Sequence, residues 1–308
     1  MSRSLPITLF LSSVCLCAGC DKLGGNAQTD RNAHASRSPA DGVDPTTTFV
    51  RSTDPAVELH NVSVDVGEDA SVTIEFSAKR IKEPGENAKI HVKAACQVGD
   101  DVLVDAITVF AWPDQWDDGA SKQLESALFT SAGLPGSPSL CEFRFFFKRL
   151  MREPELLKDL CWTGGSSIDD GRCTGLERQK SSERIEVVSV NGQLETRAYG
   201  DDDKKSLRTN YTILFGGPMP ADDLIHAKIA CTVNDDEKVE EHFPAEWLGY
   251  MASGEKMALS SSFFTAEGVD SSASCDFIVE LQNRFTAEAK VFGEFCFADG
   301  TMSEGTCG

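Results

Sequence analysis

The sequence predicts a mainly β protein made of two tandem, homologous, disulfide-stapled β-sandwich domains, each with a short helix. One segment that contains a cysteine occurs twice, at residues 90–101 and 225–236. Within it, apolar residues alternate with polar ones, which is the period of a strand with one buried face. Each half of the chain also carries four cysteines in the same order. The same small, mostly antiparallel sandwich is therefore expected in both halves.

The chain begins with the layout of an export signal. Arg3 supplies a positive charge, and a largely apolar run follows from residue 5 to residue 17. This run is shorter than the roughly 20 residues that a membrane-spanning helix needs. It is followed by the small residues Ala18 and Gly19, where a signal peptide is typically cut. Residues 1–19 are therefore expected to be a signal peptide.

The segment from Leu16 to Cys20 reads LCAGC, which resembles the lipobox of bacterial lipoproteins. In that family a diacylglyceryl group is attached to the cysteine, and the signal is cut just before it. The family usually has leucine three residues before this cysteine, whereas the present chain has Cys17 there. The resemblance implies a lipid on Cys20 that anchors the protein on the extracytoplasmic side of a bacterial membrane. The alternative is an ordinary secretory signal with an unmodified Cys20.

The number of cysteines agrees with this lipid. Of 11 cysteines, Cys15 and Cys17 would leave with the signal peptide and Cys20 would carry the lipid, which leaves eight. Eight cysteines can pair completely, whereas an odd cysteine in an oxidising compartment needs a separate explanation. The cell envelope is therefore the expected location.

Residues 20–55 are rich in Gly, Asn, Ser, Asp, Thr and Pro and contain few large apolar side chains. Such a segment cannot bury enough apolar surface to offset the entropy lost on ordering. We expect a disordered tether that holds the folded part away from the membrane. The alternative is a peptide motif for a partner.

The repeat defines the domain boundaries. Residues 90–101 read IHVKAACQVGDD and residues 225–236 read IHAKIACTVNDD, with identical residues at eight of the twelve positions. The matching register continues to the last cysteine of each half, which indicates a duplication. The predicted domains are residues 56–175 and residues 184–308, joined by a short polar link.

The coarse secondary structure is mostly strand. Strands are expected where apolar residues alternate with polar ones, at residues 72–76, 90–98, 143–147, 211–215 and 277–281. Between the strands that carry the first and second cysteines of each half, the segments Ser121–Thr130 and Glu255–Thr265 each predict a short helix.

The cysteines predict two bridges in each domain. Cys96 and Cys141 lie on the apolar sides of their strands, so a buried bridge between the two sheets is expected. Four cysteines allow three pairings in each domain, and the connectivity is a hypothesis. The expected pairs are Cys96–Cys141, Cys161–Cys173, Cys231–Cys275 and Cys296–Cys307.

A tryptophan follows the first cysteine of each domain by 16 residues, at Trp112 and Trp247. The order Cys, Trp, Cys resembles the immunoglobulin-like signature, which implies a sandwich. The chain departs from that signature because the second cysteine comes early and no tyrosine stands two residues before it. Both tryptophans are expected in the core, with exposed stacking platforms for a ligand as the alternative.

Composition and motifs exclude several functions. The formal net charge is −20, so the chain repels the phosphate backbone of nucleic acids. Serine-hydrolase elbows, zinc-protease motifs and P-loops are absent from the sequence, and the eight domain cysteines lack zinc-type spacing. We therefore predict no enzyme activity, no cofactor and no metal. The alternative is a secreted or periplasmic hydrolase that acts on carbohydrate through carboxylates such as Glu246 or Asp276.

Each repeat strand carries a histidine two residues before a lysine, His91 with Lys93 and His226 with Lys228. Both side chains of a pair lie on the same face of the strand. They are candidates for a polar binding site present once per domain. The alternative is a solvated outer face that both copies inherited from one ancestor.

Acidic residues also cluster beside the repeat strands. Asp100 and Asp101, their counterparts Asp235 and Asp236, and residues 169–171 could bind calcium if enough oxygens converged. Asp and Gly are equally typical of turns, which is the interpretation we favour.

The sequence as a whole predicts a non-catalytic cell-envelope lipoprotein. Its partners would be the membrane, through the N-terminal lipid, and a protein or glycan ligand bound by the duplicated β-domains.

Overall fold

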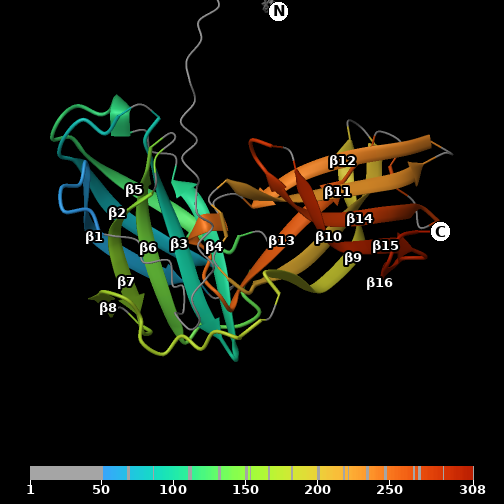
Figure 1. Ribbon diagram of the computed structural model, residues 1–308, viewed down its shortest axis with the longest axis horizontal. Coiled ribbons are helices and arrows are strands. Elements are labelled where there is room, and N and C mark those ends of the chain that lie inside the picture. The colour runs from blue at the N-terminus through green and yellow to red at the C-terminus, as the bar shows by residue number, and fades with distance from the viewer. Residues whose placement is uncertain are drawn as a thin grey trace, which may run out of the picture. The chain divides into compact units, whose positions relative to one another are not determined.

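The computed structural model describes residues 51–307 except 68–69, 86, 110–112, 131–132, 150–151, 153, 166, 182, 200–201, 218, 221, 234–235, 246–247, 266–267, 270–271 and 287. The signal peptide, Cys20 and the tether up to residue 50 lie outside the described residues. The described part is mainly β, with sixteen strands and two single-turn 3-10 helices, η1 and η2 (Figure 1). No helix within it is long and apolar enough to cross a membrane.

The first half forms two facing sheets (Figure 1). Its elements are β1 (Val57–Val66), β2 (Val72–Arg80), β3 (Lys89–Val98), β4 (Asp101–Val109), η1 (Pro113–Gln115), β5 (Ser121–Leu128), β6 (Leu140–Lys148), β7 (Glu155–Trp162) and β8 (Ile168–Asp170). One sheet has the order β1-β2-β5, and β8-β7-β6-β3-β4 forms the other layer. Alternating side chains bury a core between them, in which the Phe76 and Phe145 rings meet edge to face at 5.2 Å.

The second half repeats this order of elements. They are β9 (Ile185–Tyr199), β10 (Asp202–Phe215), β11 (Asp223–Val233), β12 (Asp236–Ala245), η2 (Leu248–Tyr250), β13 (Glu255–Phe263), β14 (Ser274–Asn283), β15 (Ala289–Ala298) and β16 (Thr301–Glu304). Here β9-β10-β13 faces β12-β11-β14-β15-β16. Tyr211 and Phe277 meet in the core at 5.1 Å. Both halves are thus sandwich-like.

A strand pairing joins the two halves. β4 pairs in parallel with β13, through residues 102–104 and 255–257, so that β8-β7-β6-β3-β4-β13-β10-β9 is one continuous sheet (Figure 1). Ala95, Val102 and Val104 of the first half belong to the core of the second. The halves therefore share both backbone hydrogen bonds and apolar packing.

The two predicted helices are wrong. Residues 121–128 form β5 and residues 255–263 form β13. In β13 every second residue is buried, including Met257, Leu259 and Phe263, which is the period of a strand. The three serines at residues 260–262 also disfavour a helix, because serine side chains compete for backbone hydrogen bonds.

The four disulfides have the expected pairs: Cys96–Cys141, Cys161–Cys173, Cys231–Cys275 and Cys296–Cys307. The expectation that the Cys96–Cys141 bridge joins the two sheets is wrong. Cys96 and Cys141 lie directly opposite each other on β3 and β6, which are neighbouring strands of one sheet. Cys231 and Cys275 do the same on β11 and β14. Alternation predicts the face of a strand on which a cysteine lies, but it does not predict which strand is its neighbour. Both cysteines of each pair lie on the core-facing side of the same sheet.

Candidate functional site

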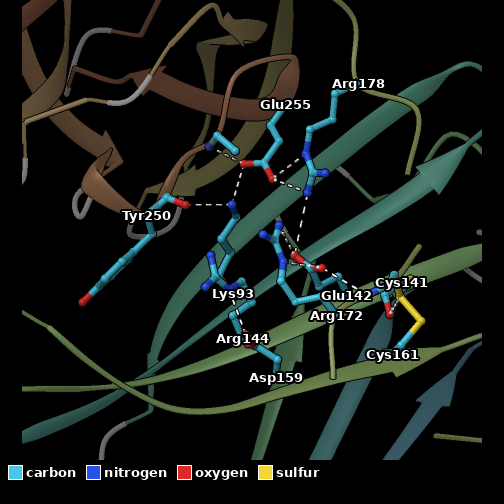
Figure 2. Close-up of polar contacts among 12 residues, drawn as sticks. Lys93, Cys141, Glu142, Arg144, Asp159, Cys161, Arg172, Arg178, Tyr250 and Glu255 are labelled. Carbon is cyan, nitrogen blue, oxygen red and sulfur yellow. Dashed lines mark hydrogen bonds and ion pairs between the residues drawn. A yellow bond between two sulfur atoms is a disulfide. The ribbon is translucent and has the colours of Figure 1, made fainter. Parts of the chain in front are cut away.

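The first candidate pair, His91 and Lys93, lies on the face of β3 that points away from the first core. Each residue is only 2% exposed. A solvated outer face is therefore wrong for this copy. The backbone carbonyl of Tyr250 from η2 and the carboxylate of Glu255 at the start of β13 both contact Lys93, so the second half covers this face (Figure 2).

Lys93 forms a buried ion pair across the two halves. Its Nζ donates hydrogen bonds to Glu255 Oε2 at 2.5 Å and to the Tyr250 carbonyl oxygen at 2.7 Å. Glu255 is fully buried, and the Ala252 backbone N–H donates to the same carboxylate oxygen at 2.7 Å. Burial lowers the pKa of Lys93, and the Glu255 carboxylate opposes that shift. The pair is satisfied by hydrogen bonds, as a buried charge requires.

Arg178, in the link between the halves, extends this pair into a network. Its Nη2 lies 3.3 Å from Glu255 Oε1 and 3.7 Å from Glu142 Oε1 on β6. Arg172 Nε donates to Glu142 Oε2 at 3.2 Å. The junction network, as we name Lys93, Glu142, Arg172, Arg178 and Glu255, thus ties the second half, the link and the first half together (Figure 2).

An aromatic contact lies beside the junction network. The Tyr250 ring stacks on Phe146 with centroids 4.2 Å apart and an angle of 14° between the rings. By alternation with Phe145 and Phe147, Phe146 points to the side of β6 that faces away from the first core. It does lie outside that core cluster, but together with Tyr250 and Leu156 it forms a separate buried cluster.

His91 is held as a neutral ring. Its Nδ1 hydrogen-bonds to Thr108 Oγ1 at 3.0 Å, and its ring lies 6.0 Å from that of Tyr250. Burial, together with the positive charges of Lys89 and Lys148, lowers the pKa of His91 from 6.5 to about 3. The imidazole therefore has a packing role at neutral pH.

This neutral histidine predicts acid sensitivity. Below pH 6.5 the unfolded chain protonates His91 while the folded chain resists down to about pH 3, so stability is lost as the pH falls through this window. The loss at pH 5 relative to pH 7.5 is expected to be about 2 kcal/mol. Urea unfolding of the His91→Gln variant at both pH values should show a loss smaller by that amount. His60→Gln, at an exposed position on β1, should leave the loss unchanged.

The second candidate pair has different surroundings. His226 Nδ1 lies 2.5 Å from Glu280 Oε1, its Nε2 lies 3.6 Å from Glu241 Oε2, and its ring stacks on Phe243 at 4.7 Å. Lys228 is half-buried. The two candidate pairs are therefore not brought together and do not form equivalent sites.

Of the two carboxylates named for a hydrolase, Asp276 is among the described residues. Glu246 lies outside them, as do Trp112 and Trp247. Asp276 Oδ1 accepts a hydrogen bond from the Cys307 backbone N–H at 2.6 Å, which holds the terminal loop. Glu142 accepts the equivalent bond from Cys173 at 3.2 Å.

The acidic pairs occupy turns and strands in the part of the chain that the structure describes. Asp100 lies in the β3–β4 turn, and Asp101 Oδ1 binds Lys256 Nζ at 2.7 Å. Asp169 and Asp170 belong to β8, whereas Asp235 lies outside the described residues. The described residues include no group of three or more His, Cys, Asp or Glu side chains arranged to hold a metal ion.

Sequence reasoning missed Glu255, Arg178 and Tyr250, which complete the junction. One signal was present for Glu255. The matching Gly119 and Gly254 are followed by Ala120 in the first copy and by Glu255 in the second, so a charge appears in one copy only.

No protein-family model matches the chain, and no curated protein sequence is similar to it.

Proposed function

We propose that the chain is a non-catalytic cell-envelope lipoprotein whose two duplicated β-domains bind a protein or glycan ligand. The observation that carries the proposal is the junction network, because its buried Lys93–Glu255 ion pair joins the two halves. The acids and bases concentrated there are engaged with one another, as a structural joint requires. Such a joint presents two domains to a ligand with one fixed relative geometry.

Matching hydrogen bonds support the duplication. Asp105 Oδ2 accepts the Phe129 backbone N–H at 2.6 Å, and Glu240 Oε2 accepts the Phe264 backbone N–H at 3.4 Å. These residues occupy equal places in the two copies. The carboxylates that hold the last cysteine of each half match in the same way. A single ancestral domain, copied once, explains both the sequence repeat and these contacts.

The location rests on two independent features. Four disulfides favour an oxidising, extracytoplasmic environment. The segment that resembles a lipobox, which ends at Cys20, would supply the membrane anchor. With both features the protein is a lipid-anchored component of a bacterial envelope.

The anchor makes a direct prediction. Cys20→Ser removes the thiol that would carry the lipid, so the protein is expected to move from the membrane fraction to the soluble fraction. Labelled fatty acid should be incorporated into the parent chain and not into the variant. Cys15→Ser, within the same signal segment, is the matched control and should leave both results unchanged. Absence of label from the parent chain would contradict the anchor.

Binding and hydrolysis can be told apart by the fate of the ligand. The purified chain, immobilised and exposed to envelope extract, is expected to retain one component in a saturable manner. That component should be released with its mass unchanged after prolonged incubation. Conversion into smaller products would instead support the carbohydrate hydrolase.

A further inference from the structure

The outer face of the second half carries an unusual set of side chains. A row crosses the sheet from Phe243 on β12 through His226 and Glu280 to Val291 on β15. A second row contains Glu241, Lys228 and Glu294, and Val239 lies next to it on β12. The outer face, as we name it, is defined by Val239, Glu241, Phe243, Glu280, Val291 and Glu294.

This face is the counterpart of the face that the junction buries in the first half. His91 and Lys93 occupy the places of His226 and Lys228, and Leu156 occupies that of Val291. In the first half these residues are buried at the contact with η2 and β13. The same surface of this fold thus already serves once in this chain as an interface, with an apolar contact beside an ion pair.

In the second half three apolar side chains of this face are exposed, although His226 between them is buried. Phe243 is 46% exposed, Val239 44% and Val291 46%. Three of the six exposed large hydrophobic residues in the described part of the chain therefore lie on this one face. Apolar side chains gathered beside charged ones are typical of a protein interaction site.

A second copy of the chain cannot repeat on this face the contact that the second half makes with the first. If it docked as the second half docks on the first, it would present Gln115 and Ala120 where η2 and β13 present Tyr250 and Glu255. The face itself has Glu280 in the place of Phe146. Neither the ring stack nor the buried ion pair would form, so a head-to-tail chain of molecules lacks its main contacts.

The charge of the face indicates what does fit. Glu241 lies directly opposite Lys228, Glu294 follows two strands away in the same row, and Glu280 lies opposite His226. The three carboxylates outnumber the lysine in these two rows, and the Glu241 side chain is 55% exposed. Anionic glycans are repelled by such a surface, and neutral glycans offer no positive charge to pair with its carboxylates. A protein segment with lysine or arginine between apolar side chains matches both properties.

We propose that the outer face of β11, β12, β14 and β15 is the docking surface for a basic, apolar segment of a protein partner. This inference rests on the proposed binding function and names the class of its ligand. Phe243 and Val239 provide the apolar contact, and Glu241 and Glu280 provide the opposite charge.

The probe for this surface is a synthetic eight-residue peptide of alternating lysine and valine, titrated into the purified full chain by calorimetry. Phe243→Ser and Glu241→Lys are each expected to weaken its binding by roughly tenfold. The matched controls are Phe285→Ser, at a 66% exposed residue outside the face, and Glu58→Lys on β1 of the first half. Each control should change the affinity by less than about twofold.

Two outcomes would overturn the proposal. Equal weakening by the face variants and the controls would mean that the acidic chain attracts any cation without a defined surface. Self-association of the parent chain in sedimentation, lost in Phe243→Ser, would assign the face to a second copy. Thermal unfolding of each variant shows whether the fold is retained, and Val239→Ser tests the same surface should Phe243→Ser unfold. If the Cys20→Ser experiment shows no lipid anchor, only the proposed location is contradicted. The peptide titrations test only the proposed docking surface.

Discussion

Replacing Glu255 with alanine is expected to lower the free energy of unfolding by about 3–5 kcal/mol. The Lys93 side chain is only 2% exposed, and the substitution removes the carboxylate that balances its charge. The hydrogen bond from Lys93 Nζ to the Tyr250 carbonyl oxygen would remain. It also removes from Arg178 one of its two carboxylate partners. Removing one member of a buried pair costs more than the pair contributes, because the other charge stays without compensation. Chemical unfolding followed by circular dichroism measures the change.

The sequence repeat supplies a matched control for this prediction. Lys228 has the same place in the second copy as Lys93 in the first, but it is half-buried. Lys93→Met should be strongly destabilising, whereas Lys228→Met should change stability by less than about 1 kcal/mol. The double variant Lys93→Met with Glu255→Leu should recover most of the loss, because it leaves no unpaired charge between them. A cost below about 1 kcal/mol for Glu255→Ala would contradict a structural role for the pair.

Much of the fold follows from short-range patterns in the sequence. Alternation places Phe143, Phe145 and Phe147 in the first core, and the structure buries all three there. The cysteine spacing suggested the correct pairs. The pairing of β4 with β13 could not be predicted, because it depends on which unpaired edges of two separate sheets meet. The local sequences of β4 and β13 do not show whether the edge of each strand pairs with another strand or remains unpaired.

The candidate site was predicted in part. His91 and Lys93 do lie on one face of β3, but their burial depends on residues about 160 positions away in the sequence. Their counterparts His226 and Lys228 have nearly identical neighbours in sequence, yet Phe243 and Glu280 on adjacent strands contact His226, and Lys228 is only half-buried. The alternation of apolar and polar residues is the same in both segments, so it cannot predict that their surroundings in the fold differ. The difference between the copies, at Ala120 and Glu255, is where the sequence does carry this information.

The disulfides give the other large expected effect. The bridge between Cys96 and Cys141 closes a loop of 45 residues, whereas that between Cys161 and Cys173 closes one of 12. By chain entropy in the unfolded state, losing the first bridge should cost about 4 kcal/mol and losing the second about 3 kcal/mol. Both cysteines of a pair are replaced by alanine so that no free thiol remains, and urea unfolding gives the difference.

The second half tests whether loop closure is the source of this order. Its two bridges close loops of 44 and 11 residues, so the same ranking is expected for Cys231 with Cys275 over Cys296 with Cys307. The longer bridge also joins residues that face each other on neighbouring strands, where it holds the register of the pair. If losing the short bridge lowers stability more than losing the long bridge in one half but less in the other, loop length does not set the order. The surrounding packing would then decide it, because it differs between the halves: Tyr250 and Glu255 of the second half cover Lys93 of the first.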